Sequence, residues 1–149
     1  MAPLLVLLSV FAVVYLADRF ILTGRIGLGF AGRIAMSAML VLTGIAHFTS
    51  TDTMVQMMPD ILPAKRELVY LTGVLELLAA GGLLWQRAAA IVSLLLIVFF
   101  LAVLPANIAG SLKEIEMGGM EYGPLYLIFR IPLQFFFIWW AWFFGVRRS

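Results

Sequence analysis

Five long apolar blocks dominate this sequence and leave it few folds. A helix needs about 20 mostly apolar residues to cross the hydrocarbon core of a bilayer. Lipid offers the backbone no hydrogen-bond partners, so spanning segments are helices or closed barrels, and the alternation of barrel strands is absent. We therefore expect an all-α bundle with transmembrane helices at residues 2–22, 32–48, 67–85, 88–112 and 124–146.

The composition agrees with a protein embedded in lipid. The chain has 149 residues, of which 64% are hydrophobic and 12% are charged. A soluble domain of this size could not bury so much apolar surface. Five spans use about 100 residues, which leaves only short connections. The sequence therefore predicts one integral membrane domain over residues 1–149.

The first block resembles a signal peptide in length but lacks the positive charges of an n-region, so we expect a retained helix. At its far end, Asp18 and Arg19 are placed to reach lipid headgroups or to pair with each other.

The distribution of positive charge predicts the orientation, because cytoplasmic connections carry the excess of Lys and Arg. We therefore expect the N-terminus outside and the C-terminus in the cytoplasm. The expected location is a bacterial inner membrane, which the chain crosses several times. The predicted inner side carries Arg19, Arg25, Arg33, Arg87, Arg147 and Arg148, and the outer side carries Lys65, Arg66 and Lys113.

Several classes of function are excluded or disfavoured by what the chain lacks. Without cysteine there is no disulfide, thiolate metal site, iron–sulfur cluster or dithiol relay. A single histidine with dispersed acids does not predict a metal site. The basic residues occur singly or in pairs and form no stripe for a phosphate backbone, so we expect no nucleic-acid partner.

One dinucleotide-like motif lies between the first two blocks. Residues 27–32 read Gly-Leu-Gly-Phe-Ala-Gly and match G-x-G-x-x-G. The fingerprint requires a preceding strand and a βαβ unit, whereas apolar helices flank it here. We therefore expect these glycines to form a tight turn.

The connection at residues 49–66 has an amphipathic pattern interrupted by Pro59 and Pro63. We expect a short helix covering the outer mouth of the bundle, with one apolar face buried and the polar residues in water. The expected buried residues are Met54, Val55, Met58, Ile61 and Leu62. We expect Asp52, Gln56 and Asp60 to stay in water or to form pairs.

Two ionisable residues lie deep within the spans, where each costs about 2.5–3.5 kcal/mol on insertion scales. By helix rise, Glu76 lies about 13 Å and Arg130 about 9 Å below the predicted outer ends of their helices. Because their depths are similar, we expect the two side chains to meet. The alternative is that this pair only fixes the register of two helices.

Further polar residues fall in the same half of the membrane, and four helices contribute. The prolines at 105 and 132 leave the carbonyls of Leu101 and Ile128 without helical hydrogen bonds. Asn107, Gln134 or Arg130 could donate to these carbonyls. We expect one polar pocket formed by His47, Tyr70, Glu76, Asn107, Arg130 and Gln134. An aromatic run is expected to form lipid-facing surface and an inner interfacial belt, or to pack against another membrane subunit; it comprises Phe135–Phe137, Trp139, Trp140 and Trp142.

Short motifs over residues 33–145 resemble the DoxX-like membrane proteins. They are Gly44-Ile-Ala-His-Phe48, Met58-Pro59 with Leu62-Pro63, the segment 69–76, Pro105-Ala-Asn107 and Arg130-Ile-Pro-Leu-Gln134. The resemblance implies a four-helix core, to which the N-terminal helix is an addition. It also implies a link to membrane redox systems, among them a quinone-reducing thiosulfate dehydrogenase. Other related groups act in thiol-linked maturation or receptor assembly, and the absence of cysteine argues against thiol chemistry here.

Two hypotheses follow for function. In the first, the pocket binds a quinone or another small amphipathic molecule, with Arg130 and His47 at its oxygens and Glu76 handling a proton. In the second, the chain is a non-catalytic subunit or assembly factor of a larger membrane complex. The residues supply no electron carrier, so a complete oxidoreductase would need a partner or a diffusible cofactor.

Overall fold

The computed structural model describes residues 2–116 and 119–148. These residues are mostly helical and include no strand. Five helical segments are long and apolar enough to cross a membrane, which confirms the all-α fold of a multi-pass membrane protein. The elements are α1 (Ala2–Phe20), α2 (Leu28–Thr49), α3 (Thr51–Met57), α4 (Lys65–Leu84), α5 (Ala89–Leu112), η1 (Met120–Tyr122), α6 (Pro124–Trp140) and the π-helical η2 (Ala141–Arg147). The last two form one continuous span.

The turn between α1 and α2 differs from the expectation. The first helix ends at Phe20, and the second begins at Leu28, four residues before its predicted start. Asp18 explains the turn, because its buried carboxylate accepts hydrogen bonds from the backbone N–H groups of Ile26 (2.8 Å) and Gly27 (3.0 Å). The expectation that Asp18 reaches headgroups or pairs with Arg19 is therefore wrong.

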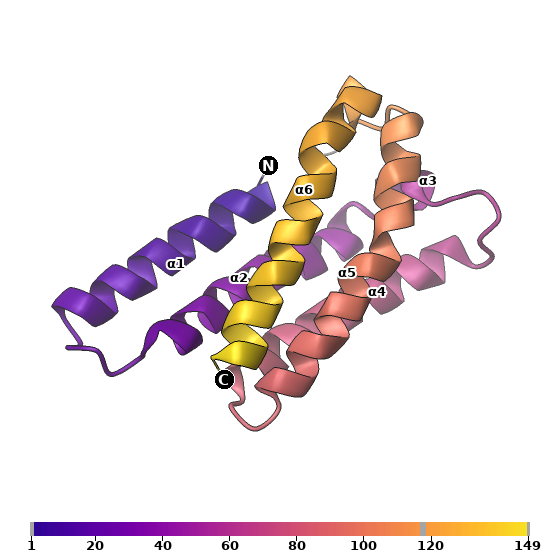
Figure 1. The fold of residues 1–149 in the computed structure, drawn as a ribbon. Coiled ribbons are helices and arrows are strands. Elements are labelled where there is room, and N and C mark those ends of the chain that lie inside the picture. The colour runs from indigo at the N-terminus through magenta and orange to yellow at the C-terminus, as the bar shows by residue number, and fades with distance from the viewer. Residues whose placement is uncertain (1, 117–118, 149) are drawn as a thin grey trace.

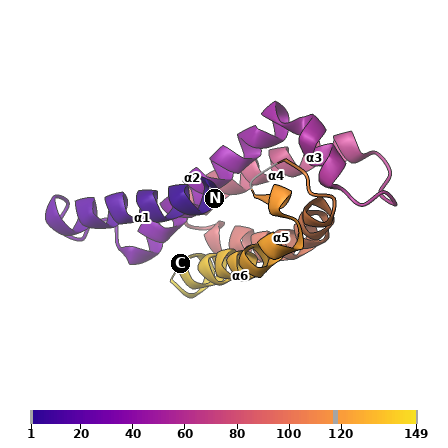
Figure 2. The same ribbon diagram turned by 90° about the horizontal axis from the view of Figure 1, so that it is seen from above.

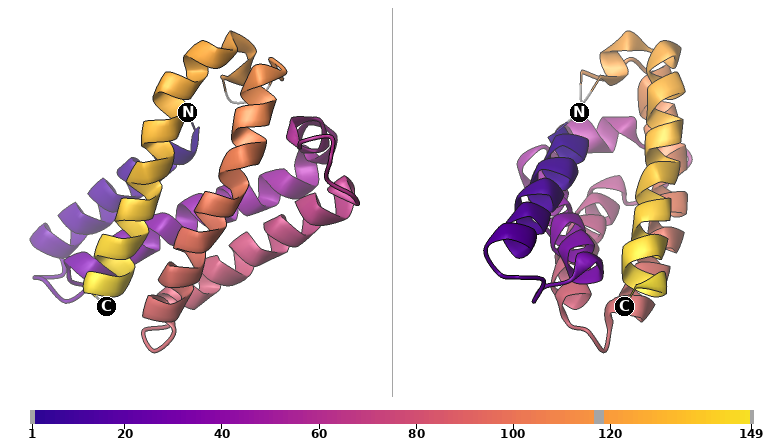
Figure 3. Two further views of the ribbon diagram at one scale, coloured as in Figure 1. Left: turned by 45° about the vertical axis from the view of Figure 1, so that its right-hand side comes forward. Right: turned by 60° about the vertical axis from the view of Figure 1, so that its left-hand side comes forward.

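The helices form two layers that cross obliquely (Figures 1 and 2). One layer holds α1, α2 and α4, with α2 in contact with both neighbours. The other is the antiparallel pair of α5 and α6, seen on one side of the molecule in Figure 3. Contacts of η2 with α2 and α5 join the layers at the end of the molecule where the chain terminates. Toward the opposite end the ribbons diverge, and η1 lies between them (Figure 2).

Small residues allow the close approach of the layers. A Cβ added to Gly32 of α2 would lie 2.2 Å from the ring of Phe144, and one added to Gly145 would lie 1.7 Å from Ser93 Oγ. The indole Nε1 of Trp140 also donates to the carbonyl of Gly32 at 3.0 Å. These contacts connect α2, α5 and η2 where the layers meet.

The glycine motif therefore serves packing as well as turning. Gly27 has a φ of 76° and lies in the turn, as expected. Gly29 and Gly32 instead lie within α2, and their missing side chains admit the backbone of Arg148 and the ring of Phe144. The expectation that all three glycines form the turn is thus wrong for the last two.

Large apolar side chains cover the outside of the bundle. Leu78, Leu95 and Ile128 are each at least 64% exposed, as expected for surfaces that lipid covers. The aromatic run divides between two environments, because a helix turns successive side chains to different faces. Phe135, Trp139 and Trp142 face outward, whereas Phe137 and Trp140 are in the core, which corrects the expectation for the whole run.

The short helix α3 covers the diverging end of the bundle. It contacts α2, α4 and α5, and Met57 packs with Met120 of η1 over Gly110 of α5. Met54, Val55 and Met58 are half-buried, while Asp52, Gln56 and Asp60 are exposed, as predicted. Ile61 and Leu62 are exposed, so their predicted burial is wrong: α3 ends at Met57, and the chain beyond it no longer follows the apolar face.

Candidate functional site

The carboxylate of Glu76 lies on the inner face of α4 and is 7% exposed. Its Oε2 lies 3.7 Å from Nδ1 of His47 on α2. Close packing of the two helices brings these side chains together, since a Cβ on Gly73 would lie 2.7 Å from His47 Cβ. His47 Nδ1 is 2.8 Å from the carbonyl of Thr43, so Nδ1 carries the proton and a neutral ring keeps Nε2 as an acceptor.

Arg130 and Asn107 form the second part of the cluster. The guanidinium Nη2 of Arg130 on α6 donates to Asn107 Oδ1 of α5 at 2.9 Å. The amide Nδ2 of Asn107 donates in turn to the carbonyl of Val103 at 3.0 Å, which fixes its orientation. Asn107 thus presents its oxygen to Arg130 and holds the cation between the two helices.

Gln134 lies one turn after Arg130 and is 2% exposed. Its Nε2 donates to the carbonyl of Phe100 at 2.6 Å. The side-chain donors therefore bond the carbonyls of Phe100 and Val103 rather than those of Leu101 and Ile128, which the two prolines were expected to release. That expectation is wrong because the crossing of α5 and α6 decides which carbonyl each side chain reaches.

Glu76 and Arg130 do not make the predicted direct contact. Their charges interact through space, but no nitrogen of Arg130 lies within 4.0 Å of the Glu76 carboxylate. The partners are His47 for Glu76 and Asn107 for Arg130. Oε2 of Glu76 and Nε of Arg130 are both buried without a hydrogen-bond partner. The cluster therefore contains an unused acceptor and an unused donor.

Tyr70 does not belong to the cluster. It is 38% exposed, and its ring stacks on Phe48 with ring centroids 5.7 Å apart. Its hydroxyl lies beside Arg66, at the start of α4. Tyr70 therefore lies at the surface of the α2 and α4 pair, apart from the buried face of α4 that Val69, Gly73 and Glu76 form.

The structure adds Tyr126 and Thr43 to the site. Tyr126 is 8% exposed and interacts electrostatically with Arg130. It precedes Arg130 by four residues, a helical spacing that could have indicated a shared face. The hydroxyl of Thr43 lies next to the Glu76 carboxyl, and Thr43 precedes His47 by the same interval.

These groups provide hydrogen-bond donors, a carboxyl and an imidazole, which suit polar oxygens and proton transfer. Among the described residues, no group of three or more His, Asp or Glu side chains could hold a metal ion.

Residues 36–145 match a family described as a domain of unknown function, DUF8561. The match runs from α2 into η2 and includes every residue of the polar cluster. The chain belongs to the DUF8561 family. Because α1 lies before the matched residues, the family domain comprises the remaining four spans. No curated protein and no solved structure matches the chain.

Proposed function

We propose that this DUF8561 protein binds a small amphipathic molecule with polar oxygens, such as a quinone, at the cluster of His47, Glu76, Asn107, Arg130 and Gln134. The observation that carries the proposal is the pair of buried atoms without hydrogen bonds, Oε2 of Glu76 and Nε of Arg130. A buried polar group without a partner costs about 1–3 kcal/mol, and more if charged. An oxygen of such a ligand would accept from Arg130, and the second cost would be removed either by a quinol hydroxyl that donates to Glu76 or by a protonated Glu76 that donates to a quinone carbonyl.

The chemistry of the cluster supports a molecule of this class. Arg130 offers N–H donors to a carbonyl or hydroxyl oxygen, and Glu76 can accept or return a proton at the same depth. His47 presents its protonated Nδ1 to Glu76 and keeps Nε2 as an acceptor, so a proton taken up at Nε2 lets the ring release its Nδ1 proton to Glu76. The resemblance to DoxX-like proteins favours a quinone, and a partner enzyme would supply the electrons for its reduction.

Binding of a short-chain quinone to the protein in lipid nanodiscs tests this proposal. We expect saturable binding by calorimetry, weakened about tenfold or more in Arg130→Gln, since a hydrogen bond to a charged group contributes about 1.5–3 kcal/mol. Glu67→Gln removes an exposed carboxyl from the same helix as Glu76 and should bind as the unchanged protein does. Absence of binding, or equal weakening in Glu67→Gln, would contradict the proposal.

Purification in mild detergent separates this function from a role as a subunit or assembly factor. A chain isolated alone with a bound lipid-soluble molecule supports the pocket. Stoichiometric co-purification of other membrane subunits, with no quinone bound, would favour the second role.

A further inference from the structure

Arg33, in the second turn of α2, is a buried cation far along the chain from the polar cluster. The residue is 4% exposed, and its Nε and Nη1 atoms are enclosed without a hydrogen-bond acceptor. Its guanidinium lies 5.2 Å from the ring centre of Phe30, a contact that provides no acceptor for those N–H groups. A buried guanidinium without acceptors is unfavourable, and hydrogen bonds to the oxygens of an anion would remove this cost.

The end of the bundle that holds Arg33 is strongly cationic. It carries six arginines but a single side-chain carboxyl, Asp18, which already accepts hydrogen bonds from two backbone N–H groups. Seven of the eight acidic residues lie elsewhere, namely Asp52, Asp60, Glu67, Glu76, Glu114, Glu116 and Glu121. The protein therefore supplies no free side-chain anion at this end.

A second arginine approaches the same face of α2. The backbone of Arg148 packs against Gly29, where an added Cβ would lie 2.3 Å from the Arg148 carbonyl oxygen. Gly29 and Arg33 are four residues apart and share one helix face. The guanidinium of Arg148 lies 4.7 Å from the ring centre of Phe143, which holds the side chain near this end.

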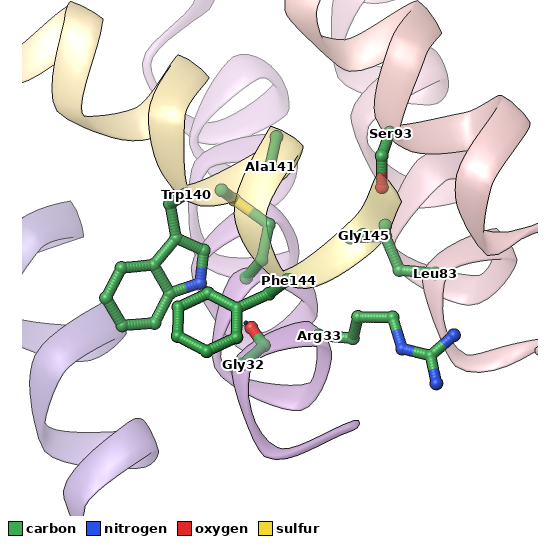
Figure 4. A pocket seen from close by; sticks show the side chains of 9 residues that line it. Gly32, Arg33, Leu83, Ser93, Trp140, Ala141, Phe144 and Gly145 are labelled. Atoms are coloured by element: carbon green, nitrogen blue, oxygen red, sulfur yellow. Dashed lines mark hydrogen bonds between the residues drawn. The ribbon is translucent and has the colours of Figure 1, made fainter. Parts of the chain in front are cut away.

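The space beside Arg33 defines where an anion can sit. Arg33, Phe144 and Gly145 line a narrow crevice that leaves no room for a water molecule. Figure 4 shows the Arg33 side chain extending away from the rings of Trp140 and Phe144. An anion would therefore meet the tip of the guanidinium rather than enter the crevice.

We propose that Arg33 and Arg148 together bind the phosphate group of an anionic lipid at this end of the bundle. By helix rise, Arg33 lies about 7.5 Å from the start of α2, close enough for its long side chain to extend toward the headgroup layer. The planar guanidinium matches two oxygens of a phosphate, and basic pockets between membrane helices commonly hold anionic headgroups. This site is separate from the polar cluster, so its test is independent of the proposed quinone binding.

Native mass spectrometry of the purified protein, equilibrated with phosphatidylglycerol or phosphatidylcholine, tests the proposal. We expect the unchanged protein to retain phosphatidylglycerol at least fivefold better than phosphatidylcholine. Arg33→Gln should lose this preference, and Arg148→Gln should weaken it. Arg87→Gln removes an exposed arginine at the same end and should leave the preference intact.

Thermal unfolding distinguishes the source of the phosphate. A rise in Tm with phosphatidylglycerol and none with inorganic phosphate supports the lipid site. A rise with inorganic phosphate and no preference between the two lipids would overturn it. Equal retention by the Arg33→Gln and Arg87→Gln variants would also overturn it. Should Arg33→Gln fail to fold, Arg148→Gln and the lipid preference of the unchanged protein decide the question.

Discussion

At the scale of single residues, the buried polar groups bond mostly to backbone carbonyls. Ser37 of α2 donates to the carbonyl of Ala80 on α4, and Gln134 of α6 donates to that of Phe100 on α5. Thr72 instead donates to carbonyls of its own helix. Only bonds of the first kind hold two helices together, so deleting a side chain should affect stability according to where its acceptor lies.

Replacing Gln134 by Leu should therefore destabilise the bundle, because it removes a hydrogen bond between two helices. We expect this bond to contribute as much free energy as other interhelical hydrogen bonds measured in membranes. Such bonds contribute about 0.6 kcal/mol on average and up to about 1.7 kcal/mol. Unfolding at increasing concentrations of a denaturing detergent measures the difference in the free energy of unfolding between the variant and the unchanged protein. Thr72→Val, which removes a bond within one helix, should change the free energy of unfolding by less, and a larger effect for Thr72→Val would contradict the argument.

The connection after α3 contains an exposed ionic contact. Asp60 accepts hydrogen bonds from Lys65 (3.0 Å) and from Lys113 (2.9 Å), and Lys113 also donates to the carbonyl of Met58. The hydrogen bonds and charges of Lys113 and Lys65 lower the pKa of Asp60 below its ordinary value. The contact therefore holds the α3 connection against the end of α5 while Asp60 is ionised.

Acid should release this contact, because a carboxyl with a lowered pKa stabilises the fold above its ordinary pKa of about 3.9. The stabilisation is lost as the pH falls through the lowered value. We expect Asp60→Asn to have a lower Tm than the unchanged protein at pH 7, with the difference shrinking toward pH 3 and below. High salt should also shrink it at pH 7. A difference that is the same at both pH values would refute this role.

At the scale of elements, glycines determine how closely the helices cross. Gly32 and Gly145 admit the side chains of Phe144 and Ser93 at distances that no Cβ would allow. Gly81 of α4, in contrast, has no atom within 4 Å of the Cβ position. The effect of a glycine-to-alanine change on stability should therefore depend on whether the glycine lies where two helices cross.

Gly32→Ala should lower the stability of the fold by about 1–3 kcal/mol, the usual cost of overpacking. Gly81→Ala is its matched control and should be neutral or stabilising by up to about 1 kcal/mol, because alanine favours helix. Thermal unfolding of the two variants in one detergent measures the contrast. Equal Tm values for both variants would show that the layers separate easily at this crossing.

At the scale of the whole molecule, charge is divided between the two ends of the bundle. The end with the α1–α2 turn, the α4–α5 turn and the C-terminus carries six arginines and one acid, while six acids lie in or beside the connections at the opposite end. This division supports the predicted orientation with the arginine-rich end in the cytoplasm. The proposed lipid site and the polar cluster would then face opposite leaflets.

Reporter fusions test this orientation. Fusions after Arg87 and after Arg148 should report the cytoplasm, and a fusion after Glu116 should report the outside. Replacing Arg19 and Arg25 by Gln and adding two arginines to the α3 connection should weaken the asymmetry and produce mixed orientation. A cytoplasmic signal at Glu116 in the unchanged protein would invert the predicted topology.

The sequence by itself determined the all-helical membrane fold and its five apolar spans. These properties depend on local hydrophobicity and on the constant rise of a helix, which are legible along one segment. Similar depth along the helices predicted one cluster of His47, Asn107, Arg130 and Gln134, and the structure pairs His47 with Glu76 and Arg130 with Asn107. The sequence could not exclude Tyr70, which lies on the same helix as Glu76 and about 9 Å nearer its start by helix rise.

The tertiary structure decided the partner of each polar group and the burial of Arg33. Both depend on the rotation of each helix about its axis, and contacts between residues far apart in the chain set that rotation. The contact of Gly73 with His47 turns Glu76 toward α2. The contact of Phe144 with Gly32 lies beside Arg33, at the end of the bundle where η2 joins the two layers. Hydrophobicity alone does not distinguish these rotations, because lipid and protein interior are equally apolar environments for most of the side chains.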